Sequence, residues 1–218
     1  MLTITEENYL KALLHLSANE IDNRGVGTNQ LATQLNVRPA TVNNMLKKLK
    51  DKDLVDYEKY GKISLTKKGE ELAIQVIRKH RLWETFLFTK LDFTWDEVHE
   101  VAEQLEHVQS EKLIEKLDKF LNYPRFDPHG DTIPSKNGTF KVEVKRTLAD
   151  CLPGSVCEVV SVRDNSTDFL QYVGSLGIGI NCKVEVINKL SFDGTLSLQI
   201  ENKKVSVSQK IAENIYIR

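Results

Sequence analysis

The chain has 218 residues, with 30 Lys and Arg against 31 Asp and Glu, so its formal net charge is −1. This length suits one large domain or two to three small ones, and 40% hydrophobic residues is ordinary for a soluble globular protein. No apolar run approaches the ~20 residues that span a bilayer, and no charged and apolar leader opens the chain. Three scattered cysteines lack CxxC spacing and indicate neither a disulfide framework nor a structural zinc site. We therefore expect a cytoplasmic protein without membrane contact.

Charge is unevenly distributed along the chain. Residues 28–68 carry nine Lys or Arg against four Asp or Glu, whereas residues 80–121 carry five against ten. The basic block is suited to contact with a polyanion, and the acidic block can concentrate cations. Solvated helix faces are the alternative explanation for both blocks.

Residues 1–68 have the pattern of a winged helix-turn-helix. Thr3-x-x-Glu6 is a capping box that opens a helix, and Thr28 caps a short second helix. The turn 36–39 follows, in which Asn36 tolerates a left-handed backbone and Pro39 suits the start of a third helix that runs to about Lys52. Residues 54–65 then predict a hairpin with basic residues near its tip, which is typical of a wing.

The polar residues of this region are candidates for DNA contacts. The major groove admits one helix, whose first turns reach base edges while lysines meet phosphates. The carboxamides of Asn43 and Asn44 can bond adenine, and Lys47, Lys48 and Lys62 are better placed for phosphates. A solvated surface role is the alternative for each. The full set of candidates is Arg38, Thr41, Asn43, Asn44, Lys47, Lys48, Lys59 and Lys62.

Residues 80–107 hold three of the five histidines together with several carboxylates. At about 100° per residue, His99, Glu103, Glu106 and His107 fall within an arc of roughly 100° on one helix face. His80 and Glu84 form a further i, i+4 pair. Clustered imidazoles and carboxylates suit a divalent first-row metal, so this pattern predicts a metal sensor or a metalloenzyme.

Zinc peptidase motifs do not fit this segment. In HExxH the second histidine would stand where the chain has Glu103, and in HxxEH the first histidine would stand at the same place. No other catalytic constellation is present. We therefore predict that the protein is not an enzyme and has no small organic substrate.

Large apolar side chains recur on the short helices of residues 69–134. Their number predicts a subunit interface or a core shared within one chain, and spacing alone does not decide between the two. The residues concerned are Leu82, Trp83, Phe86, Leu87, Phe88, Leu113, Ile114, Leu117, Phe120 and Leu121.

The composition changes after residue 135, where helical periodicity gives way to short alternating runs. Strands are predicted at 155–162, 183–188, 195–201 and 203–207, and a single helical turn at 169–174. The expected fold is therefore a mainly α winged helix-turn-helix (1–68), a helical metal-binding domain (69–134), and a small all-β barrel (135–218).

Three segments resemble the diphtheria toxin repressor and manganese transport regulator family of metal-activated repressors. They are RKHRLWE at 78–84, VHEVAEQLEHV at 98–108 and NYPRFDPHGDTIP at 122–134, in order behind the winged helix. The C-terminal module is similar to the Src-homology-3-like domain, related to FeoA, of the longer members. The resemblance implies a homodimer that binds palindromic double-stranded operator DNA when Mn(II) or Fe(II) is bound.

The resemblance also implies two metal sites per chain. Asn8, Glu103, Glu106 and His107 match the primary site. His80, Glu84 and His99 match the ancillary site, which Asp168 and Gln171 of the barrel would complete. Lys11 replaces an acidic residue found in some manganese regulators, which puts their paired-metal arrangement in doubt.

The metal itself is not decided by the residues. An oxygen-and-nitrogen site favours Mn(II) and still accepts Fe(II), so an iron-dependent repressor is the alternative. A metal-binding protein without a role in DNA regulation is a second alternative. In the turn 127–131 we expect Asp127 to act as a cap, and we do not include His129 in the site.

Overall fold

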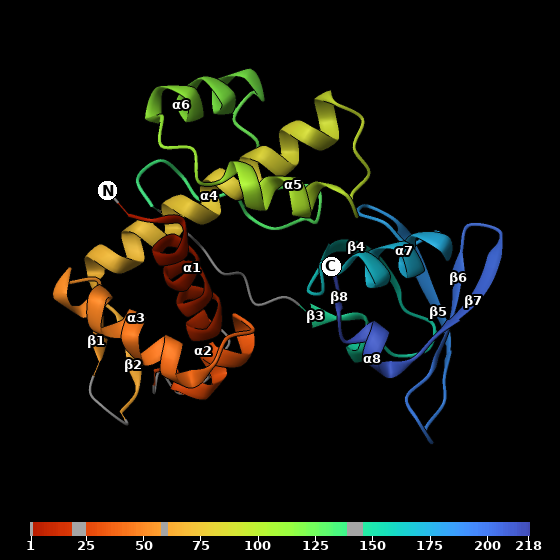
Figure 1. The fold of residues 1–218 in the computed structure, drawn as a ribbon. Helices are drawn as coiled ribbons and strands as arrows, with labels where there is room; N and C mark the ends of the chain where they lie inside the picture. The colour runs from red at the N-terminus through yellow and green to blue at the C-terminus, as the bar shows by residue number, and fades with distance from the viewer. Residues whose placement is uncertain (1, 19–24, 58–60, 139–145) are drawn as a thin grey trace. The chain divides into compact units, whose positions relative to one another are not determined.

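The computed structural model describes residues 2–18, 25–57, 61–138 and 146–218 (Figure 1). The chain divides into two compact units. The first comprises Met1–His80, Leu105–Ser110 and Pro134–Phe140, and the second Arg81–Gln104, Glu111–Ile133 and Lys141–Arg218. The division falls within one helix, α4 (Lys67–Lys90). No helix in the described ranges is both long enough and apolar enough to cross a bilayer.

Three helices, α1 (Ile4–Ala18), α2 (Thr28–Gln34) and α3 (Pro39–Asp51), open the first unit. The predicted capping box is confirmed, because Thr3 N donates to Glu6 Oε2 at 2.9 Å and Glu6 N donates to Thr3 Oγ1 at 3.3 Å. The turn before α3 is also as expected, with Asn36 at φ 51° and proline in the first turn of α3. The start of α2 differs by one residue, since Gly27 is its N-cap rather than Thr28.

A short hairpin completes the winged helix-turn-helix. Strands β1 (Val55–Tyr57) and β2 (Ile63–Leu65) are antiparallel, with Val55 opposite Leu65. The helices and the hairpin share one apolar core. Apolar residues recur at helical spacing in the helices and at alternate positions in the strands, so each element turns one apolar face inward. The fully buried members of this core include Leu10, Leu13, Leu31, Leu46, Leu49 and Ile63.

Helices also form the first part of the second unit. The end of α4 packs with α6 (Glu111–Phe120) around a small cluster of Leu82, Ile114, Leu117 and Ile133. Helix α5 (Val98–Leu105) follows the turn in which Thr94 N donates to Glu97 Oε2. In the later turn, Asp127 Oδ1 accepts from the backbone N–H groups of His129 and Asp131, at 2.8 and 2.9 Å, which confirms the predicted cap.

The rest of the second unit is a six-stranded antiparallel sheet in the order β3-β8-β4-β5-β6-β7 (Figure 1). Its buried core contains Val159, Val184, Leu196, Leu198 and Ile215, which alternate along the strands. The four predicted strands are confirmed to within one residue at each end, whereas β3 and β8 at the two ends of the module were not predicted. The elements are β3 (Arg146–Thr147), a 3₁₀ turn (Leu148–Asp150), β4 (Val156–Val162), α7 (Thr167–Ser175), β5 (Lys183–Lys189), β6 (Leu196–Ile200), β7 (Lys203–Val207), α8 (Gln209–Ala212) and β8 (Ile215–Ile217).

Candidate metal and DNA sites

One face of α1 meets the segment that follows α5. Glu7, Asn8 and Lys11 lie within roughly 100° of one another around the helix axis. Lys11 Nζ contacts both oxygens of Glu106, at 2.7 and 2.8 Å. His107 Nδ1 lies 2.6 Å from Glu7 Oε2. The contacts join residues about a hundred positions apart within the first unit.

Glu106 is the most buried carboxylate of this group, with 0% of its side chain exposed. His80 Nδ1 lies 2.6 Å from its Oε2, and His107 Nε2 lies 3.6 Å from its Oε1. Burial would raise the pKa of Glu106, but the hydrogen bond with His80 and the charge of Lys11 bring it below its ordinary value. The carboxylate is therefore ionised and ready to bind a cation.

The single helix face expected for residues 99–107 is wrong in its second half. Helix α5 ends at Leu105, and Glu106 and His107 lie in the turn beyond it. A turn follows, in which Val108 N donates to Leu105 O at 3.1 Å. Periodicity in the sequence does not show this turn, and from it Glu106 and His107 reach partners on α1 and α4. Sequence reasoning also missed Glu7, which binds His107 and accepts a hydrogen bond from Gln109 Nε2 at 2.8 Å.

Asn8 lies on the same face of α1 as Glu7 and Lys11. Its Oδ1 is buried and has no hydrogen-bond partner within the described part of the chain. A buried polar atom of this kind costs free energy unless something else satisfies it. A carboxamide oxygen on the α1 face that meets Glu106 and His107 is a suitable ligand for a hard divalent cation. The residues present thus fit a bound metal ion.

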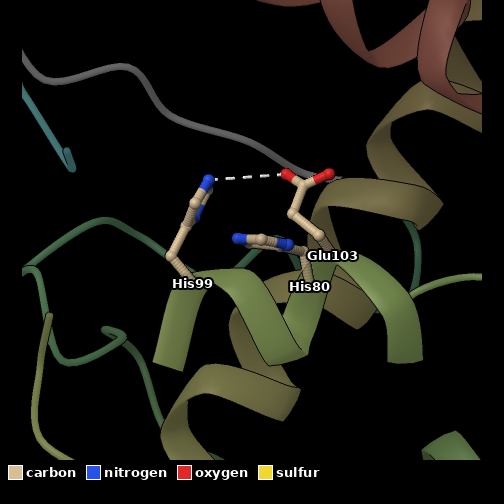
Figure 2. A group of neighbouring side chains, drawn as sticks. All are labelled: His80, His99 and Glu103. Atoms are coloured by element: carbon tan, nitrogen blue, oxygen red, sulfur yellow. Dashed lines mark ion pairs between the residues drawn. The ribbon is translucent and has the colours of Figure 1, made fainter. Parts of the chain in front are cut away.

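Figure 2 shows a second group of possible ligands, with His80 on α4 and His99 and Glu103 on α5. His99 and Glu103 are four residues apart on α5, so they lie on the same side of this helix. The dashed line joins His99 Nε2 and Glu103 Oε1, which are 3.5 Å apart. Glu103, expected in the primary site, thus lies beside His99, which was expected in the ancillary site.

A third group, Glu84, Asp127 and His129, is fully buried in the second unit. Glu84 Oε1 lies 3.2 Å from His99 Nδ1 and 3.6 Å from His129 Nδ1. Burial, together with the charges of Glu84 and Asp131, raises the pKa of Asp127 to about 7. Burial opposes the charged form of His129, but the nearby Glu84 and Asp127 raise its pKa to about 9. Two crowded carboxylates thus hold a proton that a divalent cation could replace.

The orientation of the His129 ring suits ligation. Its Nε2 lies 2.7 Å from Trp95 O and can donate a proton to it, while its Nδ1 has no hydrogen-bond partner among the described residues. Metal-bound histidines usually donate their other ring N–H to a carbonyl or carboxylate in this way. Two ligand atoms bound tetrahedrally to one ion are separated by about 3.4 Å, close to the 3.6 Å between His129 Nδ1 and Glu84 Oε1. Sequence reasoning excluded His129, since a histidine in a turn carries no periodic signal.

The two barrel residues proposed for the ancillary site have other surroundings. Asp168 is exposed in the first turn of α7 and belongs to neither cluster of possible ligands found among the described residues. Gln171 Nε2 donates to Asp96 Oδ2 at 2.9 Å. Their metal ligation stays a prediction.

The outer face of α3 carries most of the proposed DNA contacts. Arg38, its N-cap, is exposed, as are Thr41, Asn44, Lys47 and Lys48, and Lys62 is exposed beside β2. Asn43 is only half-exposed, and its Oδ1 accepts a hydrogen bond from Tyr57 Oη at 2.7 Å. Asn44 is therefore better placed for base edges than Asn43. Lys59 lies outside the described residues.

Comparison with known proteins gives a consistent assignment along the chain. Residues 1–63 match the iron dependent repressor N-terminal DNA binding domain, and residues 66–135 match the iron dependent repressor metal binding and dimerisation domain. Residues 146–218 match the FeoA domain. The predicted fold class, with its Src-homology-3-like C-terminal barrel, is confirmed.

Similar proteins include both manganese and iron regulators. A solved manganese-dependent transcriptional repressor in complex with manganese is 33% identical, with a TM-score of 0.86 over 97% of this chain and 98% of its own. The manganese regulator SloR is 36% identical, with a TM-score of 0.76 over 98% and 97%. The iron-dependent repressor IdeR of Mycobacterium tuberculosis (strain ATCC 25618 / H37Rv) is 34% identical over 130 residues, which are 60% of this chain and 55% of that protein.

The chain belongs to the family of metal-dependent transcriptional repressors that includes the iron-dependent repressors and the diphtheria toxin repressor. It matches only about half the length of the curated mycobacterial repressors. The solved manganese repressors are matched over nearly their whole length.

Proposed function

We propose that this chain is a metal-activated repressor that binds palindromic operator DNA as a homodimer in the cytoplasm and controls metal homeostasis genes. Residues 1–68 would bind DNA, residues 69–134 would bind metal and dimerise, and the barrel would follow. The observation that carries the proposal is the contact between α1 and Glu106–His107. It joins possible metal ligands to the compact unit that contains the exposed basic face of α3.

A second contact links α1 to the proposed DNA-reading helix. Lys52, the C-cap of α3, places its Nζ 2.6 and 2.8 Å from the two oxygens of Glu6. Glu6 is 4% exposed, so this ion pair is screened from solvent on one side. Adjacent residues of α1 therefore contact two different elements. Glu6 binds the end of α3, and Glu7 binds His107 in the segment after α5. A change in the position of α1 would reach α3 directly.

The primary metal ion would be held by Asn8, Glu106 and His107, with Glu103 assigned from the sequence. A bound divalent ion supplies two positive charges that fix these side chains together. The second ion would be held by Glu84 and by histidines near it. The sequence assigns His80 and His99, and the buried Asp127 and His129 supply a further pair of ligand atoms. With ligands of oxygen and nitrogen, we propose Mn(II) as the signal and Fe(II) as the alternative.

Exposed apolar side chains in the second unit support a homodimer. Phe88 is 44% exposed, Leu91 51%, Leu113 42% and Phe120 62%. They lie near the end of α4 and on α6, and aromatic and aliphatic groups this exposed favour association with an equivalent surface. A dimer presents two copies of α3, which matches a palindromic operator.

The decisive experiment is a fluorescence-anisotropy titration with DNA from upstream of the chain's own gene, at controlled free Mn(II) and, without oxygen, Fe(II). We expect the affinity for this DNA to rise about 100-fold with metal, which is within the usual range of coupling between two binding sites. Scrambled DNA of equal length is the control. Metal binding without any change in DNA affinity would instead favour a metal-binding protein without a regulatory role.

Asn8→Ala tests the proposed metal ligand on α1. Because Asn8 Oδ1 has no hydrogen-bond partner in the described chain, its removal should not lower the free energy of unfolding of the metal-free protein by more than about 0.5 kcal/mol. The Mn(II) affinity should fall at least about tenfold. Calorimetric titration measures the affinity, and Asn44→Ala, on the outer face of α3, is the control. Unchanged Mn(II) affinity in Asn8→Ala would remove Asn8 from the site.

A further inference from the structure

Lys11 forms an ion pair with Glu106, a carboxylate that the proposed primary site needs as a metal ligand. Its Nζ lies 2.7 and 2.8 Å from the two oxygens of Glu106, so the ammonium group engages both of them. The side chain of Lys11 is 14% exposed and that of Glu106 is fully buried. The ion pair is therefore largely removed from water. Charge interactions are stronger in such a buried site than at the protein surface.

The surroundings of Glu106 explain why a cation is required in the metal-free protein. A buried carboxylate without a positive partner would be costly. His80 Nδ1 and His107 Nε2 approach Glu106 at 2.6 and 3.6 Å, but an imidazole is not permanently charged. Lys11 supplies the permanent charge. It thereby stabilises the folded chain before any metal arrives.

The same interaction opposes the metal. A divalent ion needs a lone pair of Glu106 at about 2.0–2.2 Å, and it would bring two positive charges next to the ammonium group. The metal ion and the Lys11 ammonium group cannot both lie next to Glu106, because like charges only a few ångströms apart repel strongly in a poorly solvated site. The free energy of releasing Lys11 is subtracted from the free energy of metal binding.

We propose that Lys11 is an internal competitor that holds Glu106 in the metal-free protein and sets the metal affinity of the primary site. The inference rests on the proposed function, since it takes Glu106 as a metal ligand. A sensor must release its metal when the free concentration falls, and a tethered ammonium group weakens the site without removing a ligand. Lys11 is thus a residue that tunes affinity rather than one that binds the ion.

Lys79 provides a matched control. Its side chain is 12% exposed, close to the value for Lys11, and its ion pair is with Glu7 Oε1 at 3.9 Å. Lys79→Met therefore removes the same charge from the same region while leaving the contact between Lys11 and Glu106. Lys11→Arg keeps the charge and is a second control.

The test is a calorimetric titration with Mn(II) of the wild-type chain and of Lys11→Met, Lys79→Met, Lys11→Arg and Glu106→Gln. The binding event that is lost in Glu106→Gln is the one at the primary site. We expect Lys11→Met to bind at least about tenfold tighter than wild type, or about 1.4 kcal/mol. Lys79→Met should gain less than about threefold, as expected for a charge without direct contact. Lys11→Arg should stay close to wild type.

Thermal unfolding gives an independent readout. Metal-free Lys11→Met should melt at a lower temperature than wild type, and Mn(II) should raise its melting temperature by more than it raises that of wild type. If Lys11→Met folds only with Mn(II), the ion has replaced the lysine and the inference stands. If the variant is equally unstable with and without Mn(II), the inference is overturned.

Two further results would overturn it. The first is equal affinity in wild type and Lys11→Met, and the second is an equal gain in Lys79→Met. In both cases the loss of binding in Glu106→Gln would leave the proposed function intact. If Glu106→Gln binds Mn(II) as wild type does, Glu106 is not a ligand, and the proposed primary site fails together with this inference.

Discussion

Glu103→Ala combined with His107→Ala is expected to abolish metal-dependent operator binding. The pair removes a carboxylate and an imidazole from the proposed primary site while keeping Glu106 paired with Lys11 and His80. Glu103 is 38% exposed on its side chain, so its loss should cost little stability. Loss of the His107 contact with Glu7 should lower the free energy of unfolding by about 1–3 kcal/mol. The anisotropy titration should give the same DNA affinity with and without Mn(II).

A matched double variant separates the site from the general loss of charged groups. Glu100→Ala with His15→Ala also removes one carboxylate and one imidazole, but both residues are exposed. It should retain the full response to Mn(II). If the Glu103/His107 variant still bound operator more tightly with metal than without it, the proposed primary site would be wrong.

Gly130→Ala is expected to cause the largest loss of stability in the second unit. Gly130 has φ +81°, a region that side-chain-bearing residues rarely adopt, and an added Cβ would lie 1.8 Å from Val160 O and 2.8 Å from Ser161 Cα. These atoms belong to the backbone of β4 and cannot move without disturbing the sheet. We expect the free energy of unfolding to fall by about 3–5 kcal/mol.

The same substitution should disturb the buried ligand group. The adjacent His129 O accepts a hydrogen bond from Val162 N at 3.1 Å. The turn therefore contacts β4 at His129 as well as at Gly130. Pushing the turn away from β4 would move His129 Nδ1 from Glu84 Oε1. Binding of a second Mn(II) ion should weaken or disappear in the calorimetric titration, while the event that depends on Glu106 remains.

Gly154→Ala is the control for backbone strain alone. Gly154 lies in the same unit at φ +85°, and an added Cβ would meet nothing within 4 Å. Its substitution should cost only about 1 kcal/mol, measured by denaturant unfolding. Similar losses in the two variants would show that contact with β4 is not what makes Gly130 necessary.

Local signals in the sequence predicted local structure well. The capping box of Thr3 and Glu6, proline in the first turn of α3 and the Asp127 cap all depend on residues within a few positions of one another. Alternation likewise located β4 to β7, because each of these strands has one buried face. The short end strands β3 and β8 contain too few residues to show a period.

The ligand groups were only partly predictable for a different reason. His80, Glu84 and His99 stand out by helical spacing, and two of the clusters contain them. The contact of Glu7 with His107 spans 100 residues, and that of His129 with Glu84 brings a turn onto a helix. Neither is written in any local pattern. The helical periodicity of the sequence also continued past Leu105, where α5 ends and where Glu106 and His107 contact α1.

The first unit is discontinuous in sequence, and this bears on how the protein can be made and divided. Residues 105–110 belong to it although they follow the winged helix by some forty positions. During synthesis at about 5–20 residues per second, Lys11 and Glu7 leave the ribosome long before Glu106 and His107. A fragment that stops at the end of the winged helix would permanently leave Lys11 without the carboxylate it holds in the full chain. Segment 105–110 is therefore a late-arriving part of the DNA-binding unit, and a designed truncation has to include it.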